Sequence, residues 1–387
     1  MFVEGKRARL YLGSAVAAFL LLSPLSVRGD LYLGPGQLVQ AGGVDITVPG
    51  YSVPSFAHWD GDNLPDLIVG EGSGTLTPKV RVYLNSGTAT NPQFTGFFYA
   101  QSLGSDLTVP GSGCLGLFPR IVYWDADARK DLLIGRADGR IMIFLNTATD
   151  DAPSFDGGTF LQFGPAGSKT DIDVGSRATA TAVDWNSDGM KDLVVGGLDG
   201  RIHIFINDGT DTAPDFLSEQ FAQEDGANLY VPSNRSSPIV GDFNDDGRKD
   251  LLSGNTNGQL LLYPNVNTDA QPSFSGYSLI EADGTPIDLP GTPRSRPALC
   301  DWTGDEPLDI VIGAGDGGVH LYLGRCRADI NEDGNTDISD LAELLGAYGS
   351  STGDPDYNPA ADLDGDGDID LSDLASLLGA YGCSTLP

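Results

Sequence analysis

Side chains that carry oxygen recur at alternate positions in two stretches near the C-terminus, DINEDGNTDISD (329–340) and DLDGDGDIDLSD (362–373). Each stretch has Asp or Asn at positions 1, 3, 5, 7, 9 and 12, and glycine at position 6, where the chain must turn tightly. A flexible shell of carboxylate and amide oxygens suits Ca²⁺ better than Mg²⁺. The expected ligands are Asp329, Asn331, Asp333, Asn335, Asp337 and Asp340 in the first stretch and Asp362, Asp364, Asp366, Asp368, Asp370 and Asp373 in the second.

The spacing in both stretches is that of the twelve-residue EF-hand loop, with Asp instead of the usual Glu at position 12. A helix is expected after each loop, because apolar residues follow at i, i+3, i+4 and i+7. These residues are Leu341, Leu344, Leu345 and Tyr348 in the first half and Leu374, Leu377, Leu378 and Tyr381 in the second. We expect the two apolar stripes to pack together. The segment after Cys326 has 14 acidic residues and one basic residue, so its folding should depend on bound metal.

Residues 326–387 resemble a type I dockerin domain, on the loop and helix motifs just quoted. The resemblance implies a small α-helical domain with two EF-hand-type loops. It also implies that the domain binds a cohesin module and attaches a secreted protein to a larger assembly, often one for polysaccharide breakdown. Dockerins usually present polar or basic residues to the partner, whereas the matching places here hold Leu345, Gly346, Leu378 and Gly379. The expected partner is therefore a cohesin-like module or another partner, such as a cell-envelope component.

A second pattern recurs upstream, where an acidic turn precedes Asp-Leu or Asp-Ile and further apolar residues in five segments. Their last aligned aspartates, Asp66, Asp131, Asp192, Asp250 and Asp309, lie 58 to 65 residues apart. Short β-branched and aromatic runs between turn residues predict about four strands in each unit, the size of one propeller blade. The fifth unit lacks its fourth strand, and residues 31–50 resemble the missing piece. We predict a mainly β chain with a five-bladed β-propeller over residues 30–325, closed by the N-terminal strand, rather than an open solenoid or a sandwich.

The acidic turns of these repeat units are further candidates for cation sites. The third and fourth units keep every element of the pattern D-x-N-x-D-G-x-x-D, whereas the fifth has Glu306 in place of the glycine. The expected ligands are Asp184, Asn186, Asp188 and Asp192 in the third unit, Asp242, Asn244, Asp246 and Asp250 in the fourth, and Asp301, Asp305 and Asp309 in the fifth. The first and second units begin with His58 and Tyr123, so there we expect weak binding or only turn hydrogen bonds.

These segments, from AHWDGDNLPDLIVG (57–70) to CDWTGDEPLDIVIG (300–313), resemble FG-GAP repeats, also called VCBS-type repeats, of integrin-like propellers. The resemblance covers nearly all of residues 50–323. It implies that each repeat is one blade and that Ca²⁺ is bound structurally in the loop between the first two strands. Integrin-like relatives commonly have seven blades, whereas five units are visible in this chain.

The composition and the N-terminus indicate an exported protein. The chain of 387 residues has a formal net charge of −32, which repels phosphate backbones, so nucleic-acid binding is not expected. A basic start, an apolar run over 10–25 and small residues up to Gly29 predict a cleaved signal peptide over residues 1–29. The alternative is an uncleaved anchor, for which the run is short. We expect a secreted protein that is extracellular or at the cell surface, without a membrane span after cleavage.

Export permits disulfides, and the chain has four cysteines. Cys326 and Cys383 bracket the C-terminal segment and are a candidate pair, whereas the pairing of Cys114 and Cys300 stays open.

The leading functional hypothesis is a calcium-binding, non-catalytic binding or adhesion protein with a glycan or protein ligand on the propeller. The chain shows no nucleophile elbow, zincin helix or phosphate loop, and its aspartates repeat with metal spacing. His203 and His320 share a variable strand column, which favours a solvent-facing position, and the column of Trp59, Trp124, Trp185 and Trp302 favours packing between blades. The alternative is a carbohydrate-active O-glycosyl hydrolase for polysaccharide breakdown, which would need two carboxylates facing the propeller channel.

Overall fold

The structure is a computed structural model, and it describes residues 31–72, 77–109, 116–125, 127–244, 246–291, 293–305 and 307–385. The expected signal peptide, Cys114 and Glu306 lie outside the described residues. Among the helices in the described ranges, none is both long and apolar enough to cross a membrane.

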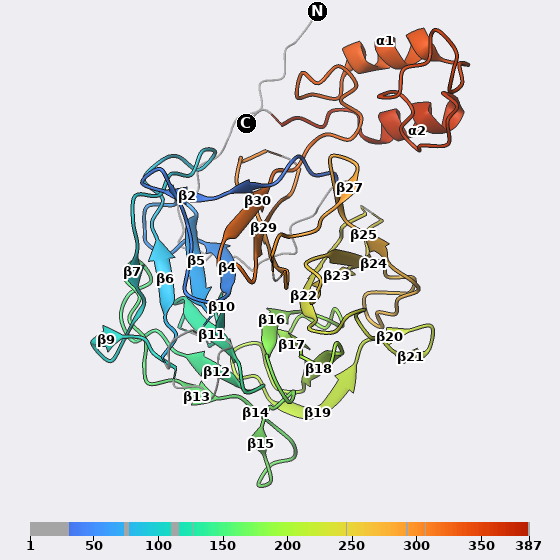
Figure 1. The fold of residues 1–387 in the computed structure, drawn as a ribbon. Coiled ribbons are helices and arrows are strands. Elements are labelled where there is room, and N and C mark those ends of the chain that lie inside the picture. The colour runs from blue at the N-terminus through green and yellow to red at the C-terminus, as the bar shows by residue number, and fades with distance from the viewer. Residues whose placement is uncertain are drawn as a thin grey trace, which may run out of the picture.

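Five antiparallel β-sheets follow one another around a ring (Figure 1). The first blade contains β4 (Ser52–Ala57), β5 (Asp66–Glu71), β6 (Val80–Tyr83) and β7 (Phe98–Tyr99). The second contains β10 (Leu117–Val122), β11 (Asp131–Arg136), β12 (Ile141–Phe144) and β13 (Thr159–Phe160). The third contains β16 (Thr179–Val183), β17 (Asp192–Gly196), β18 (Ile202–Asn207) and β19 (Phe216–Phe221). The fourth contains β22 (Ser237–Gly241), β23 (Asp250–Gly254), β24 (Leu260–Tyr263) and β25 (Ser278–Leu279), and the fifth contains β28 (Arg296–Cys300), β29 (Asp309–Gly313) and β30 (Val319–Tyr322).

Short hairpins extend the outer part of the blades. They are formed by β2 (Gln40–Ala41) with β3 (Val44–Asp45), β8 (Gln101–Ser102) with β9 (Ser105–Asp106), β14 (Gln162–Phe163) with β15 (Thr170–Asp171), β20 (Gln223–Glu224) with β21 (Ala227–Asn228), and β26 (Glu281–Ala282) with β27 (Thr285–Pro286). The fourth strand is short in the first, second and fourth blades, whereas β19 in the third blade spans six residues and also pairs parallel with β14.

The N-terminal strand closes the ring, as the sequence predicted. Strand β1 (Gln37–Leu38) pairs antiparallel with β30, so that Gln37 faces Leu321 and Leu38 faces His320. The fifth blade thus takes its outermost strand from the other end of the propeller, and its sheet has the order β1-β30-β29-β28. This pairing covers the edge that an open array of blades would expose.

The hydrophobic core is divided into five clusters, and each cluster joins two neighbouring blades. The second strand of every blade is buried along its whole length, because neighbouring blades cover both of its faces. Trp59, Trp124 and Trp185 are buried within these clusters, and Trp302 stacks on Phe56 with ring centroids 5.2 Å apart. The tryptophan column therefore packs between blades, as the sequence favoured.

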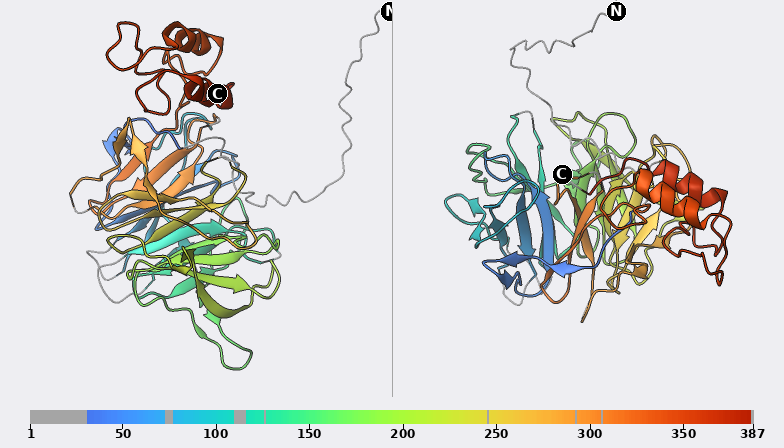
Figure 2. Two further views of the ribbon diagram at one scale, coloured as in Figure 1. Left: turned by 90° about the vertical axis from the view of Figure 1, so that its right-hand side faces the viewer. Right: turned by 90° about the horizontal axis from the view of Figure 1, so that it is seen from above.

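The C-terminal domain lies outside the ring of blades and contains α1 (Ile338–Ala347) and α2 (Leu371–Gly379) (Figure 2). Leu344 and Leu377 are fully buried in its own small core. The predicted apolar stripes are wrong in part, because Leu345, Tyr348, Leu378 and Tyr381 are exposed. A short helix pair can bury one narrow line of side chains, and the rest of each stripe stays at the surface.

Candidate metal centres

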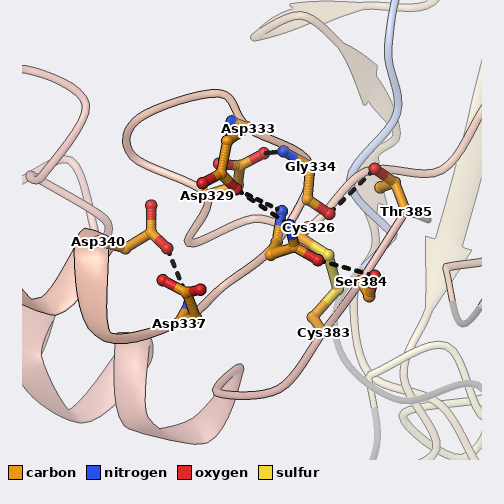
Figure 3. Close-up of a disulfide and its surroundings, with 10 residues drawn as sticks. Cys326, Asp329, Asp333, Gly334, Asp337, Asp340, Cys383, Ser384 and Thr385 are labelled. Carbon is orange, nitrogen blue, oxygen red and sulfur yellow. Dashed lines mark hydrogen bonds between the residues drawn. A yellow bond between two sulfur atoms is a disulfide. The ribbon is translucent and has the colours of Figure 1, made fainter.

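The first loop of the C-terminal domain curls around the side chain of Asp329 (Figure 3). Its Oδ1 accepts a 3.0 Å hydrogen bond from the backbone N–H of Asp333, and its Oδ2 accepts a 2.7 Å bond from the N–H of Gly334. Gly334 has φ +92°, the left-handed conformation that glycine adopts without strain. Burial raises the pKa of Asp329, while the two N–H donors act in the opposite direction.

The carboxylate at position 12 of this loop connects the loop to α1. Asp340 is fully buried, and its Oδ1 accepts a 2.8 Å hydrogen bond from the N–H of Ile330. Its Oδ2 accepts a 2.8 Å bond from the N–H of Asp337, while Asp337 caps the helix by accepting from Ser339. This reciprocal capping box fixes the helix start against the loop.

The second loop repeats this capping of the helix, but its first aspartate accepts from positions 4 and 6 instead of positions 5 and 6, and three of its carboxylates lie close together. Asp362 accepts from the N–H groups of Gly365 at 2.9 Å and Gly367 at 3.1 Å, and Asp373 accepts from Leu363 and Asp370. Carboxylate oxygens of Asp362, Asp364 and Asp373 lie within 4.8 Å of one another. The loop thus brings predicted positions 1, 3 and 12 together. Asp366 and Asp368 are not members of that group, and Asp366 accepts from the N–H of Asp368.

A disulfide holds the C-terminal domain closed beside the first loop. Cys326 and Cys383 are bonded, which confirms the candidate pair. The chain beyond Cys383 then returns to the loop, where Thr385 donates both its N–H and its hydroxyl to the carbonyl of Gly334. Within the described residues Cys300 is a free, buried thiol, and burial raises its pKa.

The loops of the third and fourth blades share the hydrogen-bond pattern of the first C-terminal loop. Asp184 accepts from the N–H groups of Asp188 at 3.1 Å and Gly189 at 3.0 Å. Asp242 accepts from Asp246 at 3.2 Å and Gly247 at 2.9 Å. Asn186 and Asn244, at position 3, accept from the same position-5 N–H groups. Although a strand follows here and a helix follows in the C-terminal domain, positions 1, 3, 5 and 6 are connected by the same hydrogen bonds in the three loops.

The remaining three blade loops differ from this pattern. In the first and second loops only the turn bond at position 3 remains, in which Asp60 and Asp125 accept from residues two positions later, because position 1 is His58 or Tyr123 instead of an aspartate. The fifth loop gathers oxygens of Asp301, Asp305 and Asp309 within 4.8 Å of one another. Burial raises the pKa of Asp305, and its Oδ1 is buried with no hydrogen-bond partner in the described part of the chain.

The last aspartate of every blade motif has a structural role that the sequence analysis did not anticipate. Each is fully buried, and both of its carboxylate oxygens accept backbone N–H groups from two separate segments of its blade. The donors are Trp59 and Asn85 for Asp66, Trp124 and Asn146 for Asp131, Trp185 and Asn207 for Asp192, Phe243 and Asn265 for Asp250, and Trp302 and Gly324 for Asp309. Burial raises the pKa to about 6 at Asp131, Asp192, Asp250 and Asp309, against the opposing effect of these donors.

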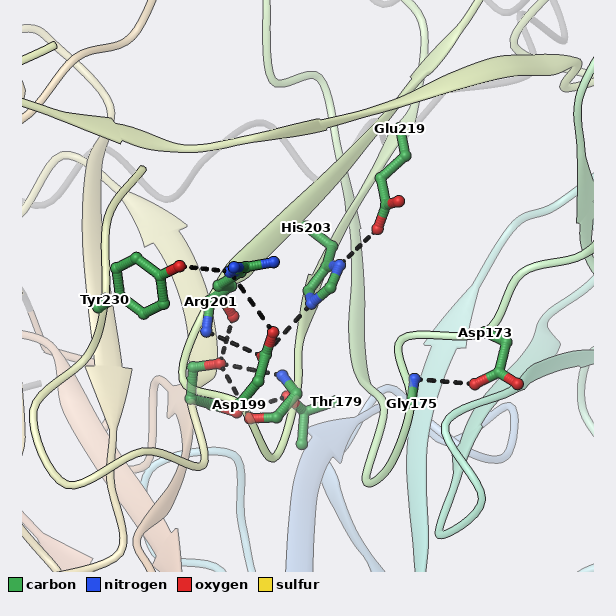
Figure 4. A network of polar contacts seen from close by, with 10 residues as sticks. Asp173, Gly175, Thr179, Asp199, Arg201, His203, Glu219 and Tyr230 are labelled. Carbon is green, nitrogen blue, oxygen red and sulfur yellow. Dashed lines mark hydrogen bonds and ion pairs between the residues drawn. The ribbon is translucent and has the colours of Figure 1, made fainter. Parts of the chain in front are cut away.

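His203 and His320 are buried, so the predicted solvent-facing position is wrong. Neighbouring strands and blades cover the third strand of a blade, so the residue type at this position can vary between blades although the position is buried. Nδ1 of His203 lies 2.5 Å from a carboxylate oxygen of Glu219, and Nε2 lies 3.5 Å from one of Asp199 (Figure 4). The ring also contacts Phe221 at 5.1 Å between centroids.

The cavity at the axis of the propeller lies where the innermost strands begin. Its described lining consists of Phe118, Arg177, Thr179, Arg235, Ser236, Ser237, Arg294, Ser295 and Arg296. This lining is basic and hydroxylic, and it includes no pair of carboxylates among the described residues.

Comparison with known families agrees with both parts of the fold. Residues 184–253 match the model of the FG-GAP-like repeat, and residues 327–379 match that of the dockerin type I domain. No curated protein matches the chain.

Several solved structures are similar to the propeller at low identity. CoXyl43, a GH43 beta-xylosidase/alpha-arabinofuranosidase from a compost microbial metagenome, is 11% identical with a TM-score of 0.46, covering 75% of this chain and 94% of its own. A GH43_1 enzyme from Xanthomonas citri is 13% identical with a TM-score of 0.44, covering 72% and 88%. The Tc holotoxin pore of Photorhabdus luminescens is 13% identical with a TM-score of 0.37, covering 74% of this chain, which spans only 12% of that protein. On the observed sheets and the two matching family models, the chain is a five-bladed β-propeller that contains an FG-GAP-like repeat, followed by a type I dockerin domain.

Proposed function

We propose that this protein is a secreted, calcium-binding, non-catalytic binding or adhesion protein that is attached to a larger assembly through its dockerin domain. In this proposal residues 1–29 are a cleaved signal peptide, residues 30–325 form the propeller and residues 326–387 form the dockerin domain. The observation that carries the proposal is the shared loop geometry, in which one aspartate accepts the N–H groups of positions 5 and 6 in the first dockerin loop and in two blades.

The side chains at these loops fit a calcium ion. All predicted ligands are carboxylate or amide oxygens, which suits a hard cation rather than zinc or copper. The second dockerin loop and the fifth blade loop each gather three carboxylate oxygens within 4.8 Å, an arrangement that repels itself unless a cation lies between them. When bound, Ca²⁺ would hold each loop in its curled form. Asp340 and Asp373 would then fix the starts of α1 and α2 against the curled loops, because their carboxylates accept hydrogen bonds from the loop backbone.

The dockerin domain offers a duplicated apolar surface for a partner. Ile338 and Leu371 are 66% and 67% exposed, and Leu345 and Leu378 are 53% and 55% exposed, at equivalent places on the two helices. Side chains of this size cost free energy when they stay in water, so their repeated exposure supports a docking role. The partner is a cohesin-like module, and a cell-envelope component is the alternative.

The propeller is proposed to bind a ligand rather than to cleave one. A glycosidase needs an acid and a second carboxylate on opposite sides of the scissile bond, about 5 to 10 Å apart. The described axial cavity presents arginine, serine and threonine side chains instead. The buried tryptophans do not form an open sugar platform, because they fill the space between blades.

The attachment is tested by capture of the full chain on immobilised cohesin modules and on cell-envelope fractions, with Ca²⁺ or with EDTA. We expect capture that requires Ca²⁺ and that is lost when Leu345→Glu and Leu378→Glu are combined. Leu217→Glu, an exposed leucine on β19, is the matched control and should leave capture intact. Capture on envelope fractions alone would identify the alternative partner, and capture that persists in EDTA would contradict a calcium-dependent attachment. A glycan array in the same buffers tests the ligand of the propeller.

A further inference from the structure

Arginines from three blades converge on the axial cavity. Arg177, Arg235 and Arg294 occupy equivalent places, two residues before the start of β16, β22 and β28. Arg296, the first residue of β28, lies beside them in the same cavity. Arg177 belongs to the third blade, Arg235 to the fourth, and Arg294 and Arg296 to the fifth. Only the arrangement of the blades in a ring brings these guanidinium groups together.

Three of these arginines hold a backbone conformation that favours glycine. The φ angles are +60° at Arg177, +59° at Arg235 and +103° at Arg294, and the equivalent place in the second blade is Gly116 with φ +73°. A left-handed backbone costs about 1 kcal/mol or more for a residue with a Cβ atom. Arginine therefore occupies this place in three blades despite a local cost, which points to a use for the side chain.

The guanidinium groups lack the carboxylate partners that arginines elsewhere in this chain have. Arg81, for example, bonds Glu71 at 2.7 Å. Within the described residues no ion pair reaches Arg177, Arg235, Arg294 or Arg296. Arg177 is 8% exposed, and its Nε is buried with no hydrogen-bond partner in the described ranges; the same holds for Nη1 of Arg235. A buried donor without an acceptor is costly, so these atoms are poised for an acceptor from outside.

Mutual repulsion adds to this cost. Burial, together with the charges of Arg177, Arg294 and Arg235, lowers the pKa of Arg296 to about 9. Burial and Arg235 lower that of Arg177 to about 10. The ring of Tyr51 receives the guanidinium groups of Arg294 at 4.4 Å and Arg296 at 4.9 Å from its centroid, with Arg177 further away at 5.8 Å. One aromatic ring shared by three cations offsets only part of their repulsion.

We propose that this arginine cluster binds a small oxyanion group, a carboxylate or a sulfate, presented either as a free ion or by an acidic sugar. The planar guanidinium forms paired hydrogen bonds with such groups, which would satisfy the free Nε and Nη1 donors. The cavity has a volume of about 20 Å³, room for about one water-sized oxygen of the head group, so the rest of the group and any sugar ring would remain at its mouth. The inference rests on the proposed binding role of the propeller and names the chemistry of its ligand.

The net charge of the whole protein opposes non-specific binding of anions. A formal net charge of −32 repels anions over most of the surface, so a general attraction to acidic compounds is excluded. An anion bound by this protein therefore requires a local positive site, and the axial cluster provides one.

The inference is tested by calorimetric titration of the calcium-loaded full chain with sodium sulfate, sodium acetate, galacturonate and galactose, each at low millimolar concentration and constant ionic strength. We expect binding of at least one oxyanion and none of galactose. The combined Arg177→Gln and Arg235→Gln variant should bind roughly ten- to a hundredfold more weakly, because it loses charged hydrogen bonds. Arg201→Gln, a half-exposed arginine paired with Asp199, is the control and should bind as the wild type does.

Thermal unfolding distinguishes a binding site from a purely structural cluster. Sulfate should raise the melting temperature of the wild type and of Arg201→Gln more than that of the double variant. Sulfate also stabilises folded proteins in general, and the shift measured for the double variant gives the size of that general effect. Binding of sulfate and acetate without galacturonate assigns a free ion, whereas tighter binding of galacturonate assigns an acidic sugar. Equal sulfate effects in wild type and double variant, or no binding of any oxyanion, would overturn the inference. Neutral glycans bound on an array would in that case leave the proposed binding role intact.

Discussion

The backbone N–H of Trp124 donates a 2.8 Å hydrogen bond to Oδ2 of Asp131, and the other oxygen of the same carboxylate accepts the N–H of Asn146 at 2.9 Å. One buried side chain thus joins the end of β10 to the segment after β12. The equivalent aspartates do the same in all five blades, so these paired hydrogen bonds, called the aspartate bracket below, are a repeated element of the blade itself.

Asp131→Asn is therefore expected to destabilise the propeller. The amide keeps one acceptor but turns an N–H₂ group toward a backbone donor, which should lower the free energy of unfolding by about 1 to 3 kcal/mol. Urea unfolding of the full chain measures this loss. Asp151→Asn, at an exposed aspartate of the same blade, is the control, and equal midpoints for the two variants would rule out the bracket.

Removal of calcium should unfold the dockerin domain and spare the blades. Without an ion, the carboxylates of Asp362, Asp364 and Asp373 repel one another, so α2 loses the loop that caps it. Helix α1 then loses the partner with which it shares its small core. The helical circular dichroism signal of the full chain should fall in EDTA and return with Ca²⁺. The combined Asp340→Ala and Asp373→Ala variant should lack this response, and an unchanged helix signal of the wild type in EDTA would refute the coupling.

The blade loops should differ in calcium binding. Asp184→Asn and Asp242→Asn should each remove one ion from the stoichiometry measured by calorimetry, because each side chain organises positions 5 and 6 of its loop. Asp125→Asn, in the second blade, is the matched control and should leave the number of ions unchanged. If the full chain binds no more ions than the two dockerin loops account for, the blade sites do not exist.

Loss of the disulfide should destabilise the dockerin domain without abolishing its calcium response. The bond between Cys326 and Cys383 closes a segment of 57 residues, and removing such a constraint costs up to about 4 kcal/mol. The combined Cys326→Ser and Cys383→Ser variant should therefore melt its helices at a lower temperature at saturating Ca²⁺. An unchanged melting temperature would show that the metal loops alone determine the stability of this domain.

Much of the architecture was determined by local patterns in the sequence. The repeated acidic turn and its flanking strands predicted five blades, and the resemblance of residues 31–50 to a fourth strand predicted that the N-terminus closes the ring. Position 6 glycines and position 1 aspartates likewise separated the third and fourth loops from the first and second. These features can be predicted from the sequence because each depends on residues that are close together in the chain, within one repeat unit.

Only the tertiary structure decided which faces are covered and which side chains meet. His203 is buried and Leu345 is exposed, although each sits in a pattern that suggests the opposite, because burial depends on the neighbouring blade or on the second helix. Arg177, Arg235 and Arg294 lie about sixty residues apart in the chain and look like unrelated loop residues. They form one positive cluster because ring closure brings the starts of the innermost strands to a common axis. No local sequence pattern shows that these three residues lie close together in space.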